Sequence, residues 1–174
     1  MTRGELRKVY LRDVTLGDLR LYERMRCDPV MMAELGGPLP KQSVPGKLRR
    51  DVAAVERDES WISIIESDDG EDMGSVVLWS HDDHGEPISE IGWMVLPEFQ
   101  GRGLGRSATA ALLDRARTDG RWGAIHAYPG ATNAPSNGIC RSLGFTLLET
   151  TDIEFEDRTI TANHWRLEPA RPGA

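Results

Sequence analysis

The sequence predicts an α/β (α+β) protein with a mixed, mostly antiparallel central sheet of about seven strands flanked by helices. Three observations lead to this class. Short runs with alternating apolar residues recur along the chain and are typical of strands. Turn residues separate the runs in the first half, which favours antiparallel neighbours. An alanine-rich helix then connects two apolar runs by the crossover that makes two strands parallel.

The first third of the chain is expected to be mainly helical. A strand over residues 8–13 precedes a helix that begins at Thr15, where a capping-box-like pattern uses Asp18 at its third position. A second short helix is predicted over residues 30–35. Residues 47–59 form a third, charged helix with a single buried stripe of apolar residues.

An antiparallel meander follows these helices. Strands over residues 61–66 and 74–80 form a hairpin, and a turn over residues 81–87 leads into a further strand over residues 91–96. The sequence predicts no metal site, because the polar residues of that turn supply neither rigid geometry nor a fourth ligand. These residues are His81, Asp82 and His84.

Elements of the second half alternate between helix and strand. The alanine-rich helix begins at Arg106 and closes at Asp119-Gly120, and a parallel strand follows it. A further helix precedes two closing strands. Beyond the first helix, the predicted ranges are 122–128 (strand), 133–143 (helix), 146–151 and 159–167 (strands).

Composition limits the classes of function. At 174 residues the chain has the usual length of one domain, and we expect one domain over residues 1–174. The net charge of −7 argues against nucleic acid as a partner, and no apolar run approaches the roughly 20 residues of a membrane helix. Cys27 and Cys140 show neither pairing nor metal spacing, which favours a reducing cytoplasm. Monomer and homodimer both stay open.

The most informative stretch covers residues 90–111, EIGWMVLPEFQGRGLGRSATAA. Its apolar strand leads into a loop with glycine at every second position from 101 to 105, directly before the alanine-rich helix. Bare N–H groups at a helix N-terminus and the helix dipole both favour an anion. Arg102 and Arg106 add two cations, so the loop is predicted to hold a pyrophosphate.

Two familiar phosphate loops do not fit this stretch. A Walker A loop fails because Arg106 stands in place of its lysine and Gln100 in place of its first glycine. Gly103 and Gly105 begin a near match to the dinucleotide-binding fingerprint. That fingerprint requires an acid at the end of the next strand, and the predicted strand ends at Tyr128 without one.

A third pattern, Gln/Arg-x-x-Gly-x-Gly/Ala, is matched in full by Gln100, Gly103 and Gly105. In this the chain resembles the GNAT superfamily of acyl-CoA N-acyltransferases. A second motif about thirty residues downstream agrees in order and distance. It comprises Asn133, Ser136 and the Leu-Gly-Phe of residues 143–145.

The resemblance implies a GNAT fold, with the sheet splayed at its parallel pair beside Leu96. The spacing of Asn133 and Ser136 is most similar to the branch that contains the ribosomal-protein alanine N-acetyltransferases. In this family the pantetheine arm of acetyl-CoA, the co-substrate, pairs with the strand backbone before the loop, and the pyrophosphate sits on the loop. The implied cofactor-binding residues are Met94, Val95, Leu96, Gln100, Gly101, Arg102, Gly103, Gly105, Arg106, Asn133 and Ser136.

The resemblance also implies direct attack of an amine on the thioester in a ternary complex. Glu90 lies close to where histone-type relatives carry a catalytic glutamate, and Ser136 is the expected donor to the sulfur. A solvated strand end and a helix cap are the plain alternatives for these two residues. The glutamate–tyrosine dyad of N-terminal acetyltransferases is absent, because Tyr128 and Cys140 stand at its positions.

We therefore expect an acetyl-CoA-dependent N-acetyltransferase that acts on a primary amine, either a protein N-terminus or a small amine. The alternative is an acyl-CoA-binding sensor of the same fold without turnover. Residues 28–60 and 150–160 are expected to frame the acceptor. The acidic group in the second segment, Asp152, Glu154, Glu156 and Asp157, suits a cationic acceptor or is simply an exposed hairpin.

Overall fold

A computed structural model describes residues 9–169 of the chain. Within it one seven-stranded sheet has the order β1-β2-β3-β4-β5-β7-β6. All neighbours are antiparallel except β4 and β5, so the predicted mixed sheet is confirmed. The strands are β1 (Val9–Asp13), β2 (Ser60–Ser67), β3 (Asp72–Asp83), β4 (Glu86–Val95), β5 (Ile125–Ala127), β6 (Thr146–Phe155) and β7 (Arg158–Leu167).

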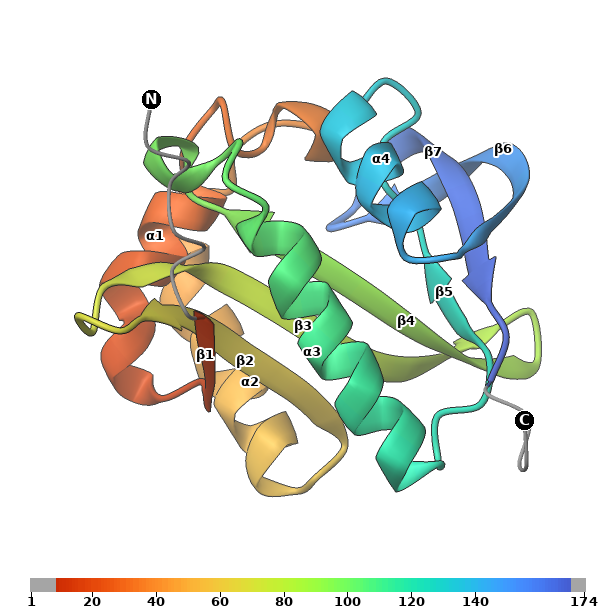
Figure 1. Cartoon of the computed structure of the whole chain (residues 1–174). Coiled ribbons are helices and arrows are strands. Elements are labelled where there is room, and N and C mark those ends of the chain that lie inside the picture. The colour runs from red at the N-terminus through yellow and green to blue at the C-terminus, as the bar shows by residue number, and fades with distance from the viewer. Residues whose placement is uncertain (1–8, 170–174) are drawn as a thin grey trace, which may run out of the picture.

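Helices cover both faces of this sheet (Figure 1). The longest, α3, runs across β4 and β3 on the same face as α4, whereas α1 and α2 pack together on the opposite face. No helix in the described part of the chain is long and apolar enough to cross a membrane. The helices are α1 (Leu19–Arg26), α2 (Val44–Glu56), α3 (Leu104–Asp119) and α4 (Ala134–Ser142), with short 3-10 turns at Leu16–Asp18, Ala33–Leu35, Lys41–Ser43 and Pro97–Phe99.

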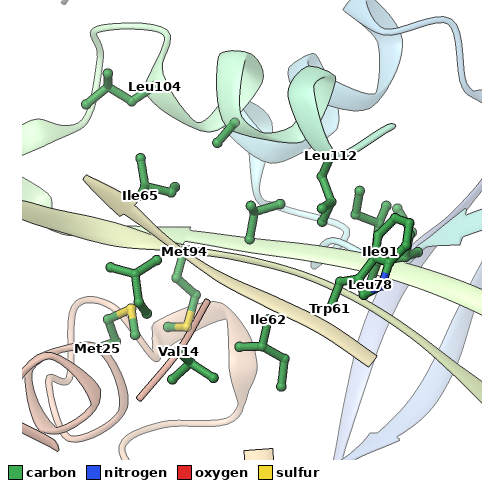
Figure 2. Packing of buried hydrophobic residues seen from close by; sticks show 14 of the residues in the cluster. Val14, Met25, Trp61, Ile62, Ile65, Leu78, Ile91, Met94, Leu104 and Leu112 are labelled. Atoms are coloured by element: carbon green, nitrogen blue, oxygen red, sulfur yellow. The ribbon is translucent and has the colours of Figure 1, made fainter. Parts of the chain in front are cut away.

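The hydrophobic core lies in two layers, one on each side of the sheet (Figure 2). Leu104 and Leu112 of α3 fill the layer above the strands, and Met25 of α1 fills the layer below. Met94 points from β4 toward Met25. Since side chains alternate along a strand, Glu90 shares the α1 face of the sheet with Met94.

The parallel pair of strands is very short. Ser89 pairs with Ile125 and Glu90 with His126, and no further pairing between β4 and β5 is recorded in residues 9–169. The two strands therefore separate from Ile91 onward, five residues earlier than the splay expected beside Leu96. On its other side β5 pairs with β7 over its full length, and the chain stays beside β7 beyond Ala127, where the Pro129 carbonyl accepts from the Asn163 N–H at 2.9 Å.

Several predicted boundaries are wrong for local reasons. The turn expected over residues 81–87 is a tight hairpin at His84-Gly85, whose positive φ angles of 53° and 89° suit a two-residue loop. The parallel strand has three residues instead of the expected seven, and the short helix over residues 30–35 is only the turn Ala33–Leu35. Lys8, placed in the first strand, lies outside the described residues.

Candidate active site

A cleft of about 590 Å³ opens where β4 and β5 separate. One wall is β4 with the start of α3, and the other is the segment from β5 to α4. The third side is built by the end of α1, the turn after it and the β6–β7 hairpin. Apolar lining residues come from all three sides, among them Met31, Leu35, Val77, Trp79, Trp93, Ile139, Ile153, Phe155 and Ile160.

The backbone of β4 turns alternate residues toward the cleft. The Leu96 N–H donates to the Met73 carbonyl at 2.9 Å, so Leu96 faces β3. Because antiparallel ladders alternate, Met94 faces β3 as well and Val95 faces away from it. The Val95 carbonyl accepts from Gln100 Nε2 at 2.8 Å. Of the three residues expected to pair with pantetheine through their backbone, only Val95 is therefore directed to the cleft.

The glycine loop has the geometry of an anion cradle. Gly101 and Gly103 have φ angles of 74° and 75°, which favour glycine, and an added Cβ would meet no atom at either position. The helix begins at Leu104, two residues before the expected start. Its first described bond runs from the Ser107 N–H to the Gly103 carbonyl at 3.0 Å. The N–H groups of the first turn therefore lie outside the helical ladder.

Gly105 has a different role in the same loop. A Cβ built there would lie 3.1 Å from Ile139 Cδ1, 3.5 Å from Val95 and 3.7 Å from Trp93. The position is therefore restricted by the close approach of α3 to β4 and α4. Arg106 Nε donates to Ser142 Oγ of α4 at 3.1 Å, which ties the two helices together beside the loop.

The hydroxyl of Ser136 faces the cleft and does not cap the helix. Asn133 is the N-cap of α4, and its Oδ1 accepts from the Ser136 N–H at 3.2 Å. Trp93 Nε1 donates to Ser136 Oγ at 3.3 Å across the gap between β4 and α4. A helix N-terminus, a hydroxyl and the splayed edge of β4 thus meet at one point of the cleft.

Asn137, which the sequence analysis did not single out, anchors this wall. Its amide donates to the carbonyls of Gly130 and Asn133 at 2.9 and 2.8 Å. Its Oδ1 accepts from Asn163 Nδ2 and Trp165 Nε1 of β7 at 2.9 and 2.8 Å. All four hydrogen bonds of this buried side chain are made, so the start of α4 is held rigidly against the sheet.

Glu90 lies at the vertex where the two strands part. It lines the cleft with 18% of its side chain exposed, and its Oε2 is 2.8 Å from His81 Nε2. The hydrogen bond to Glu90 is the main cause that raises the pKa of His81. The carboxylate is thus half-sheltered, fixed by one partner and open to the cavity, as a proton acceptor must be.

Three aromatic rings stack beyond Glu90. His126 Nδ1 is 2.7 Å from His164 Nε2, and the Tyr128 ring stacks on His164 with a centroid distance of 4.4 Å. Burial is the first cause that lowers the pKa of His126 and that raises the pKa of Tyr128 to about 12. Cys140 lies in the core, where burial raises its pKa to about 12. Neither position of the missing dyad therefore holds a group that ionises readily near neutral pH.

Long-range contacts close the acceptor side. Thr132 Oγ1 donates to Glu34 Oε2 at 2.8 Å, which joins the turn after α1 to the segment before α4. Arg158 of β7 donates to the carbonyls of Gly37 and Pro38, the latter at 2.8 Å. Parts of both segments expected to frame the acceptor, residues 28–60 and 150–160, therefore lie at this side of the cleft. The four acidic residues at 152, 154, 156 and 157 are exposed, and the cleft is lined by their apolar neighbours instead.

Two charged residues of the cleft were not singled out from the sequence. Glu34 lies in a turn with no pattern to mark it. Arg26 could have been found, because Leu19, Tyr22 and Arg26 follow the spacing of one helix face, which places a charge where an apolar residue is expected. Both Arg26 and Glu34 line the cavity.

The sheet split at one parallel pair and the glycine loop at its mouth define the acyl-CoA N-acyltransferase class. The family model described as Acetyltransferase (GNAT) domain matches residues 8–146. The chain therefore belongs to the GNAT acetyltransferase family, and the enzyme class predicted from the sequence is confirmed. None of the curated proteins compared with the chain matches it.

Solved structures with the same fold cover nearly the whole chain. A spermidine N-acetyltransferase from Vibrio cholerae, in complex with CoA and spermine, has a TM-score of 0.76 at 18% identity over 92% of this chain and 95% of that one. The structure of yncA from Salmonella typhimurium, with its cofactor acetyl-CoA, has a TM-score of 0.73 at 21% identity over 95% of this chain and 96% of that one. An acetyltransferase from the same organism modifies the N-terminal serine of ribosomal protein L7/L12. Its structure has a TM-score of 0.75 at 15% identity over 92% of this chain and 94% of that one.

Proposed function

We propose that residues 1–174 form one N-acetyltransferase domain that transfers the acetyl group of acetyl-CoA directly to a primary amine. The observation that carries this proposal is the position of the glycine loop and the start of α4. Both helix N-termini flank the gap where β4 leaves β5, so one long ligand can reach both. The CoA-bound relatives of the same fold support CoA as that ligand.

The glycine loop and the adjoining edge of β4 bind CoA. The free N–H groups at the start of α3 suit the diphosphate, and Arg102 and Arg106 add positive charge at the loop. Arg102 Nη2 donates to the Glu98 carbonyl at 2.9 Å, which keeps that side chain folded along the loop. The unpaired edge of β4 at Val95 and Trp93 offers backbone groups to the pantetheine arm, as a neighbouring strand would.

The residues near the point where β4 and β5 separate carry out the acetyl transfer. Glu90 accepts the proton that an ammonium group must lose before its nitrogen can attack the thioester carbon. An N–H of the free β4 edge stabilises the charge that develops on the thioester oxygen. Ser136 donates a hydrogen bond to the sulfur as the carbon–sulfur bond breaks. Each of these groups lines the cleft.

Turnover with Glu90→Gln tests this assignment. We expect kcat to fall by about 10²–10⁴ while CoA affinity stays within about twofold, because only the proton acceptor is lost. Glu86→Gln, an exposed glutamate on the same strand, is the matched control and should be neutral. The measurement is CoA release with a panel of primary amines.

Two results would overturn parts of the proposal. An unchanged kcat in Glu90→Gln removes this residue from the mechanism. CoA binding without turnover of any amine favours the acyl-CoA sensor, for which the missing dyad at Tyr128 and Cys140 is the supporting observation. The unpaired cysteines among the described residues support a reducing cytoplasm as the site of action.

A further inference from the structure

Arg26 is a cation inside the cleft without a partner of its own. It is the last residue of α1, and it lines the cavity together with Ser75 and Val77 of β3. Helix α1 lies on the face of the sheet opposite α3 (Figure 1). Its Nε is fully buried and makes no hydrogen bond within residues 9–169. No ion pair of the described residues includes this guanidinium.

The acids nearest to Arg26 are engaged elsewhere. Asp51 accepts from the Tyr22 hydroxyl at 2.8 Å and lies 3.4 Å from Lys47 Nζ. Glu156 lies 3.8 Å from the same ammonium group. Burial is the main cause that lowers the pKa of Arg26, and electrostatic interactions with Tyr22, Asp51 and Glu156 oppose it only in part. These two acids act on Arg26 only at a distance, and no carboxylate of the described residues binds its guanidinium directly.

A buried guanidinium nitrogen without a hydrogen bond is costly, and arginine does not escape the cost by losing its proton. Its planar donors match a carboxylate bidentately. The cradle proposed for the diphosphate of CoA, residues 101–106, begins α3, whereas Arg26 ends α1 on the other face of the sheet (Figure 1). We therefore expect the anion that Arg26 binds to belong to the acceptor.

The surroundings of Arg26 further define the acceptor. Val77 and Trp79 of β3 and Phe155 and Ile160 of the closing hairpin line the same cavity. These side chains give an apolar lining to the cavity that Arg26 and Glu90 share. An acceptor that fits both has an apolar body, an anion at one end and the reacting amine near the other.

We propose that the acceptor is an amine that also carries a carboxylate, an apolar amino acid or a close analogue, and that Arg26 binds this carboxylate. The inference rests on the transferase function proposed above and names its substrate class. A polyamine lacks the anion altogether. A protein N-terminus has an amide in place of the carboxylate and leaves Arg26 unpaired.

Matched acceptors test the inference on the unaltered protein. CoA release is measured with the apolar L-amino acids, each beside its primary amide, and with spermidine. We expect at least one acid to exceed its amide by about 30-fold or more in kcat/KM, since a site built for a polar group rejects analogues that leave it unpaired. If the amides or spermidine have kcat/KM values as high as those of every acid, the inference is wrong and the transferase function still stands.

Variants then assign the effect to Arg26. Arg26→Gln should lower kcat/KM for the preferred acid by about 100-fold and change its amide by less than about threefold, with Arg26→Lys between the wild type and Arg26→Gln. CoA affinity should be unchanged, which also shows that the cleft is intact. Arg20→Gln, an exposed arginine of the same helix, is the control. Equal losses for acid and amide, or a loss of CoA affinity, would contradict the assignment.

If CoA binds and none of these amines is acetylated, the proposed transferase function fails, and the inference fails with it.

Discussion

The two halves of the cleft are built in different ways. The cofactor half comes mainly from one continuous stretch, β4 through the start of α3, and presents backbone groups and two glycines with positive φ. The acceptor half is assembled from the end of α1, the turn after it, β3 and the β6–β7 hairpin, and presents side chains. The first half is therefore a local property of the sequence, and the second is a property of tertiary contacts.

This difference explains what varies among proteins of the same fold. A loop made of backbone groups suits an anion whatever the neighbouring side chains are. A wall made of side chains from four segments changes its chemistry with single substitutions. Two solved structures of the same fold differ in their acceptors, since one is a spermidine N-acetyltransferase and another modifies a ribosomal-protein N-terminus.

The largest effect in this comparison is expected at the cofactor half. Gly103→Val adds a β-branched side chain at φ 75° and covers the free N–H groups. We expect CoA affinity to fall on the order of 100-fold, the equivalent of about two charge-assisted hydrogen bonds. Calorimetric titration with CoA measures it.

Gly120→Val is the matched control for that change. Gly120 closes the same helix at φ 82°, also with open space around a Cβ. Both variants should lower the free energy of unfolding by roughly 1–3 kcal/mol through backbone strain. Only the Gly103 variant should lose CoA affinity. Equal CoA affinities in the two variants would contradict the proposal that this loop binds the diphosphate.

A smaller effect is expected at the acceptor half. Arg158→Ala removes the donors to the Gly37 and Pro38 carbonyls that hold the turn after α1 against the hairpin. We expect KM for the amine to rise about tenfold, because charge-assisted hydrogen bonds contribute roughly 1.5–3 kcal/mol, with CoA affinity unchanged. Steady-state kinetics in both substrates measure this. Arg117→Ala, a surface arginine paired with Asp114, should change neither value.

The smallest effect concerns pH. The pKa of His126 is lowered in the folded protein, mainly by burial, so the unfolded chain binds more protons just below the ordinary value of 6.5. The free energy of unfolding should therefore fall as the pH drops through this window. His81 has the opposite sign, because its raised pKa adds stability below 6.5 that is lost as the pH rises through the folded value.

Urea unfolding at about pH 5.5 and 7.5 separates the two histidines. His126→Gln should reduce the acid loss of stability, and His81→Gln should increase it. His84→Gln, at a turn with 98% of the side chain exposed, should leave the pH dependence unchanged. Parallel behaviour of the His81 and His126 variants would contradict their assigned environments.

Features that depend on hydrogen bonds between residues close in the sequence could be predicted, and features that depend on tertiary contacts could not. The capping box of Thr15 and Asp18 is confirmed, because both of its hydrogen bonds lie within four residues. The parallel strand was predicted too long. It pairs with β7 over all three of its residues, but only Ser89 and Glu90 of β4 pair with it, and no local pattern encodes where β4 moves away.

The acceptor wall could not be predicted for a related reason. Glu34 and Thr132 are far apart in the chain, and only the folded sheet brings them to 2.8 Å. In the strand alternation of the closing hairpin, Ile153 and Phe155 line the cleft while Asp152 and Glu154 are exposed. The acidic residues were the visible feature of the sequence, and their apolar neighbours are the ones that form the wall.

Hydrogen exchange of the backbone with and without saturating CoA tests most directly whether the amides at the start of α3 hold its diphosphate. The account predicts slower exchange in residues 101–106 and along the free edge of β4, with β1 and β2 unaffected. Unchanged exchange in residues 101–106 at saturation, or protection confined to another part of the chain, would contradict it.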